Sequence, residues 1–175
     1  MTRNNLEAGL GLGEAEFERF HARTAVGLWA YLRRLGGDPA LADDLLQESY
    51  VKFLGHVNPA SEEQEQRAYL YRIATNLVRD RWRQAKREVL GIGWLFRQWE
   101  ERSRDGSVPL RIDLESAFSR LGPRERALLW LAYVEEYNHR EIAGILGLKE
   151  ASVRVLLFRA RNKAARELDR KEVRS

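Results

Sequence analysis

Apolar residues recur three or four positions apart along almost the whole chain, the spacing that places them on one face of an α-helix. One such stripe runs from Phe17 to Leu35, and another runs from Leu70 to Val78. No segment alternates apolar and polar residues for long enough to favour a β-strand. The sequence therefore predicts an all-α fold.

Glycine, proline and capping residues mark where the helices of the first half end and begin. Gly36-Gly37 ends the first predicted helix, and Asp38-Pro39 supplies an N-cap and a first helical residue for the second. Asn58-Pro59 predicts a break, followed by an acidic, polar stretch at residues 61–66. A third long helix is predicted at residues 66–88.

Glycine, proline and capping residues also mark the helix boundaries in the second half of the chain. Gly122-Pro123 predicts a new helix at residues 124–136, Asn138 caps a short one, and Gly147 separates it from a last helix at residues 150–169. We therefore predict two small helical bundles joined by a linker. The predicted parts are a flexible N-terminus at 1–13, a first bundle at 14–89, a linker at 90–112, a second bundle at 113–170 and a tail at 171–175.

Composition excludes several classes of protein. The chain of 175 residues has no cysteine, so disulfides, cysteine-based zinc sites and cysteine nucleophiles are excluded. Its three histidines lie far apart, and we expect neither a metal site nor a cofactor. The first 13 residues lack the apolar core of a secretory signal, and no apolar stretch is long enough to span a membrane. We expect a cytoplasmic protein with no membrane insertion.

Positive charge is concentrated in two predicted helices, although the net charge of the whole chain is only +4. Residues 137–148 followed by the basic segment 149–166 form a helix-turn-helix pattern, which suits the major groove of DNA. The alternative is a plain helical hairpin with a solvated basic face. Residues 67–88 interleave arginines with Tyr69, Tyr71 and Trp82, which suits single-stranded nucleic acid. The alternative there is that Tyr69 and Trp82 are core residues.

A third segment is acidic. Asp43, Asp44, Gln47 and Glu48 lie on adjacent faces of the second predicted helix. Paired carboxylates can serve acid–base catalysis or bind a metal, but no histidine, phosphate-binding loop or nucleophile accompanies these. We predict a docking surface for a basic partner, no catalytic residue and no enzymatic activity.

In this order, the three segments resemble the extracytoplasmic-function (ECF) group of sigma-70 family sigma factors. Residues 42–48 are similar to the polymerase-docking helix of that group, and residues 67–80 are similar to its −10 recognition and melting helix. Segments of its −35-binding domain are matched by residues 121–126, 141–143 and 158–161. The resemblance implies a bacterial specificity subunit that binds core RNA polymerase and promoter DNA, as duplex at −35 and as single strand at −10. It leaves open whether an anti-sigma factor is a partner.

The resemblance also implies a role for particular residues. Core polymerase would be bound by Asp43, Asp44, Gln47 and Glu48. The −10 DNA would be contacted by Asn58, Ser61, Arg72, Asn76, Arg79, Asp80 and Arg83, with the loop at 58–66 holding a flipped-out base. The −35 DNA would be contacted by Arg140, Ser152, Arg154, Val155, Phe158 and Arg159, with Arg140 on phosphate.

Two features depart from the family pattern. Val155 and Leu156 stand where a polar or basic pair is usual, so either the −35 preference differs or base reading is weaker, although Val155 could contact a thymine methyl group. In the linker, Trp94, Leu95, Phe96 and Trp99 are apolar where the family is polar or acidic. We expect this stripe either to pack on one of the protein's own bundles or to be a docking site for an inhibitory partner or for polymerase.

Two other functions remain as alternatives at this point. One is a conventional helix-turn-helix regulator, whose first bundle would serve dimerisation or ligand binding. The other is a sigma-like adaptor that docks on polymerase but reads promoters weakly.

Overall fold

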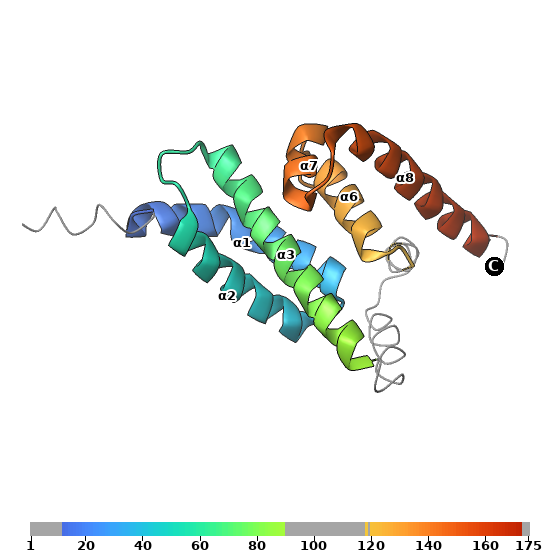
Figure 1. Ribbon diagram of the computed structural model, residues 1–175, viewed down its shortest axis with the longest axis horizontal. Helices are drawn as coiled ribbons and strands as arrows, with labels where there is room; N and C mark the ends of the chain where they lie inside the picture. The colour runs from blue at the N-terminus through green and yellow to red at the C-terminus, as the bar shows by residue number, and fades with distance from the viewer. Residues whose placement is uncertain (1–11, 90–117, 119, 173–175) are drawn as a thin grey trace, which may run out of the picture.

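The computed structural model describes residues 12–89, 118 and 120–172, and every regular element within these ranges is an α-helix (Figure 1). The helices are α1 (Glu14–Gly36), α2 (Pro39–His56), α3 (Glu63–Val89), α6 (Pro123–Tyr133), α7 (His139–Leu146) and α8 (Glu150–Glu172). The prediction of an all-α protein is confirmed. The apolar stripe predicted between Trp94 and Trp99 lies outside the described residues.

Helices α1, α2 and α3 form the first bundle. Gly37 ends α1 in the left-handed conformation, with φ of 79°, and Asp38 accepts a hydrogen bond from the backbone N–H of Ala40 at the start of α2. The predicted break between the two helices is therefore confirmed. In the core, Phe20 of α1 stacks on Phe53 of α2 with ring centroids 4.9 Å apart.

Helix α3 begins three residues before its predicted start at Gln66. Glu63 and Glu65, which were assigned to a separate acidic stretch, lie in its first turn. Acidic side chains are favourable there because the free N–H groups give a helix N-terminus partial positive charge.

Helices α6, α7 and α8 form the second bundle. Asn138 caps α7 by accepting from the backbone N–H of Glu141, whose carboxylate accepts from the N–H of Asn138 in return. Gly147 ends α7 with φ of 65°, as its position after the apolar stripe predicted. Helix α6 ends at Tyr133, three residues before its predicted end, because the chain turns at residues 134–137.

The two bundles pack directly against each other. Helix α7 lies on α3, and α6 lies on α1 (Figure 1). Buried residues of both bundles belong to one continuous core. Leu12, within the segment predicted to be a flexible N-terminus, is also buried in this core. The sequence predicted two bundles and did not predict the contact between them.

Candidate nucleic-acid and protein interfaces

The acidic residues of α2 lie on its outer face. Asp43, Asp44 and Gln47 are exposed and Glu48 is half-buried, whereas Leu45 on the opposite face is completely buried. Oδ1 of Asp43 accepts a hydrogen bond of 2.7 Å from Nε1 of Trp29 on α1. Glu48 lies 3.2 Å from Lys52 of the same helix and 3.5 Å from Arg81 of α3. The four predicted docking residues thus form one water-accessible patch, anchored at both ends by neighbouring helices.

The −10 residues predicted on α3 also form one stripe. Arg72, Arg79, Asp80 and Arg83 are exposed and Asn76 is half-buried. Their spacing of three and four places them on one side of the helix. Arg79 donates to Oδ1 of Asn76, and Arg83 lies 3.7 Å from Asp80.

The aromatic residues of α3 do not join that stripe. Tyr71 is only 1% exposed, and Tyr69 and Trp82 are half-buried against the core. The predicted surface of interleaved arginine and aromatic side chains is therefore wrong, and the core interpretation of Tyr69 and Trp82 is correct. The ring of Tyr71 packs against Tyr31 of α1 and Tyr137 of the second bundle, and the ring of Tyr69 packs against Phe53 of α2.

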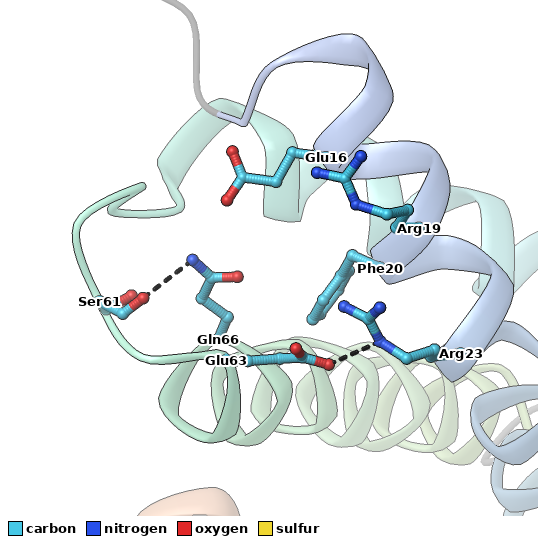
Figure 2. Close-up of a pocket in the computed structure, with 7 residues that line it drawn as sticks. All are labelled: Glu16, Arg19, Phe20, Arg23, Ser61, Glu63 and Gln66. Atoms are coloured by element: carbon cyan, nitrogen blue, oxygen red, sulfur yellow. Dashed lines mark hydrogen bonds and ion pairs between the residues drawn. The ribbon is translucent and has the colours of Figure 1, made fainter.

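The loop between α2 and α3 borders a polar cavity of about 260 Å³ (Figure 2). Asn58 shapes this loop, since its side chain accepts from the N–H of Ala60 and its carbonyl accepts from Oγ of Ser61 at 2.7 Å. Gln66 donates to the Ser61 carbonyl from inside the cavity. The cavity is lined by Glu16, Arg19, Phe20, Arg23, Ser61, Glu63 and Gln66. Among the predicted −10 residues only Ser61 belongs to this lining, and the α1 contributions were missed.

The helix-turn-helix is present as predicted. Leu148 after the Gly147 turn donates its N–H to the carbonyl of Ala143, and the small core between α7 and α8 includes Ile142 and Val153, both fully buried. The outer face of α8 carries Arg154, Val155, Phe158 and Arg159, all exposed, and Ser152 is half-buried. Arg140 is exposed near the start of α7. The two residues of the pair that departs from the family pattern are placed differently, since Val155 is 49% exposed whereas Leu156 packs against the core.

An ion pair fixes α8 to α6. Nζ of Lys163 lies 2.7 Å from the carboxylate of Glu125, which also accepts from the backbone N–H of Gly122 at 2.7 Å. Partial burial opposes ionisation of Glu125, but these two hydrogen bonds outweigh it and hold the pKa of the carboxyl below its ordinary value. The orientation of the recognition helix thus depends partly on a charge.

The described part of the chain has neither a metal-binding cluster nor a membrane-spanning helix. No group of three or more histidine, aspartate or glutamate side chains is placed to hold a metal ion among residues 12–89, 118 and 120–172. None of the described helices is long and apolar enough to cross a membrane.

Family comparisons match both bundles. The model of sigma-70 region 2 matches residues 21–88, and that of sigma-70 region 4 matches residues 111–163. The ECF RNA polymerase sigma factor SigM of Bacillus subtilis is 31% identical over 140 residues, covering 78% of this chain and 85% of that protein. The RNA polymerase sigma-E factor of Streptomyces avermitilis is 29% identical over 161 residues, covering 90% and 88%.

Solved structures share the fold. The sigma factor RpoE of Bartonella quintana, in complex with the anti-sigma factor NepR, has a TM-score of 0.70 at 20% identity, covering 87% of this chain and 96% of that one. CnrH, in complex with the cytosolic domain of CnrY, has a TM-score of 0.62 at 25% identity and 90% coverage of both chains.

Proposed function

The chain belongs to the ECF group of sigma-70 family RNA polymerase sigma factors, and from this membership we propose how its surfaces divide the work of starting transcription. It is a promoter-recognition and initiation factor that binds core RNA polymerase and promoter DNA. Sigma factors are not enzymes, so each surface is a binding surface. It works with polymerase in the cytoplasm.

The outer face of α2 docks on core polymerase through Asp43, Asp44, Gln47 and Glu48. Three of these four side chains are exposed, and the carboxylates give the patch a charge complementary to a basic partner. The bonds from Trp29 and Arg81 hold two of the carboxylates in place, which lowers the entropy lost when the partner binds.

The stripe on α3 binds the −10 element. Its three exposed arginines can follow a phosphate backbone, and Asn76 can meet a base edge with its amide. The polar cavity beside Ser61 supports capture of an unpaired base, because hydroxyl, amide, carboxylate and guanidinium groups converge on it together with the ring of Phe20. Asn58 shapes the loop rather than lining the cavity.

The outer face of α8 reads the −35 duplex. Arg154 and Arg159 flank Val155 and Phe158 on the same exposed side, with Ser152 one turn before Val155 and Arg140 of α7 available for phosphate. The adaptor alternative is that Val155 and Leu156 make duplex reading weak. Leu156 packs against the core, so of this pair only Val155 is on the reading face, and Arg154 and Arg159 beside it support duplex reading.

The observation that carries this proposal is the exposure of the α3 stripe and of the α8 face on two different bundles of one chain. The test is transcription in vitro with core polymerase on a genomic library, where we expect discrete start sites that share −10 and −35 sequences. Absence of promoter-specific starts would overturn the proposal. A conventional regulator would instead bind duplex DNA with equal affinity in the absence of core polymerase.

A further inference from the structure

A buried carboxylate lies where the two bundles meet. Glu135, in the turn between α6 and α7, has a side chain that is only 4% exposed. It accepts hydrogen bonds from Arg67 of α3 and from Nε1 of Trp130, the latter at 3.0 Å. Burial of a carboxylate is strongly unfavourable unless an opposite charge compensates it. Trp130 belongs to the same bundle and is neutral, so the compensating charge comes from the other bundle.

The backbone of the turn is built to present this side chain. Glu136 adopts φ of 57°, a left-handed conformation that non-glycine residues rarely adopt. The N–H groups of Glu135 and Tyr137 bond to the carbonyls of Trp130 and Leu131, at 3.1 and 2.9 Å. As a result Glu135 and Tyr137 both point toward the first bundle, while Glu136 between them is exposed.

Aromatic side chains from both bundles surround the pair. The rings of Tyr71 and Tyr137 meet edge to face at 5.8 Å, and the guanidinium of Arg67 lies 5.8 Å from the centre of the Tyr137 ring. Burial, followed by the charge of Glu135 and a hydrogen bond with it, raises the pKa of Tyr71 well above its ordinary value, so its hydroxyl stays protonated beside the carboxylate. Helix α1 also approaches closely, since a Cβ at Gly27 would lie 3.2 Å from that hydroxyl and 3.5 Å from Oε1 of Glu135.

Weaker contacts flank this centre. Gln64 of α3 donates to Glu141 of α7 at 3.1 Å, on the exposed side, and Arg126 of α6 donates to the Arg34 carbonyl of α1 at 3.2 Å. Two buried groups at the centre, Nε of Arg67 and the hydroxyl of Tyr137, make no hydrogen bond to any of the described residues. Opening the interface would expose both groups to water, and their hydration would offset part of the free energy that opening costs.

This packed arrangement is incompatible with simultaneous contact to both promoter elements. The −10 and −35 elements are about 25 base pairs apart, or roughly 85 Å of duplex. Helix α3, with 27 residues, is only about 40 Å long, and α7 of the DNA-reading bundle lies directly on it. The bundles must therefore separate before α3 and α8 can reach both elements.

We propose that Glu135 and Arg67 form a latch that holds the free protein in a closed form, and that the latch must open for promoter binding. The proposal rests on the function proposed above. Because only the open form can make the productive complex, the apparent affinity falls in proportion to the fraction of the protein that is open. Weakening the latch should therefore raise the apparent affinity without any new contact to DNA or polymerase.

Energy transfer between two fluorescent labels, one on each bundle, reports the distance between the bundles in the free protein. Because the chain contains no cysteine, Gly55→Cys on α2 and Ala165→Cys on α8, both exposed, give two labelling sites without background. We expect clearly lower transfer in Glu135→Gln and in Arg67→Met than in the parent protein. The double variant should be no more open than either single variant, since both remove the same contact. Glu18→Gln removes an exposed carboxylate of α1 and is the matched control that should change nothing.

The same proteins are then tested with core polymerase and a promoter. We expect the two latch variants to form open complexes at about 3-fold or more lower concentration than the parent, with equally low transfer in all bound complexes. Unchanged transfer in both free variants, at unchanged helical content, would overturn the latch, as would transfer in the bound parent as high as in the free one. Failure of the parent to bind polymerase at all would instead overturn the proposed function, and the measurement on the free protein would still decide the latch. Arg67→Met lies on the more exposed side of the pair, so it keeps the test valid if Glu135→Gln does not fold.

Discussion

The indole N–H of Trp29 on α1 donates a hydrogen bond of 2.7 Å to Oδ1 of Asp43 on α2. This bond fixes one oxygen of an exposed carboxylate and leaves the other to a partner. The orientation of the proposed polymerase-docking patch is therefore set partly by a residue that the sequence pattern of the patch does not include.

Replacing Trp29 with Phe should weaken core polymerase binding by about 2- to 10-fold, because the Asp43 carboxylate is no longer held in place and a single hydrogen bond contributes about 0.5–1.5 kcal/mol. The ring remains, so the free energy of unfolding should change by less than about 1 kcal/mol. Binding is measured by titrating labelled protein with core polymerase. Asp43→Ala should lose at least as much affinity, and Trp29→Phe should have no further effect in that background. A further loss in the double variant would show that Trp29 acts independently of Asp43.

Replacing Arg79 and Arg83 together with Ala should impair promoter opening by about 10-fold or more while polymerase affinity changes by less than about 2-fold. Both side chains are exposed on the proposed −10 stripe, away from the α2 patch, and each phosphate contact contributes to binding of single-stranded DNA. Reactivity of unpaired thymines near −10 reports opening, and co-purification with core polymerase reports docking. Equal loss of both activities would mean that the stripe is misassigned.

Stability should depend on the ionisation of Glu125. Its pKa is lower in the folded state than the ordinary value of 4.5, so its contribution is fully present above about pH 4.5 and is lost as pH falls through the lower, folded value. Glu125→Gln should be less stable than the parent near neutral pH by about 1 kcal/mol or less, since Lys163 is partly exposed and the pair is screened. This difference should shrink as pH falls below about 4.5 when unfolding is followed by circular dichroism. A constant difference at every pH would show that packing, not charge, is responsible.

The turn of the helix-turn-helix should resist substitution. Gly147 has φ of 65°, while no atom lies within 4 Å of the position that a Cβ would take. Gly147→Ala should therefore destabilise the fold by about 1 kcal/mol through backbone strain alone. Gly144→Ala in α7, where the same space is open and φ is helical, should be neutral or stabilising in the same thermal unfolding experiment. Equal destabilisation by both substitutions would contradict the strain explanation.

Local features of this fold could be predicted because local chemistry decides them. The breaks at Gly37 and Gly147 and the caps at Asp38 and Asn138 each depend on a few adjacent residues. The contact between Glu135 and Arg67 could not be predicted, because it joins residues 68 positions apart and neither belongs to a motif of its own.

The wrong or missing predictions at the proposed −10 site also concern contacts between residues that are far apart in the sequence. Tyr71 was placed on a nucleic-acid surface because tyrosine beside arginine suits stacking, but its side of α3 faces the second bundle. The α1 side of the cavity was missed because Arg19 and Arg23 carry no motif of their own, and only the fold brings them opposite Ser61.

The exposed valine of α8 leads to a prediction about the −35 sequence itself. Val155 is 49% exposed on the face that carries Arg154 and Arg159, and an apolar side chain there can contact the methyl group of thymine. Once a −35 element has been identified, replacing each of its thymines with deoxyuridine removes that methyl group and no hydrogen-bonding group. At one or more positions we expect the deoxyuridine duplex to bind the protein about 3- to 5-fold more weakly. This corresponds to about 0.8 kcal/mol, the free energy of burying one methyl-sized group. Val155→Ser should bind the thymine and deoxyuridine duplexes equally, whereas Val155→Thr, which retains a methyl group, should keep part of the difference. If the parent protein binds both duplexes equally at every position, Val155 does not read a thymine methyl.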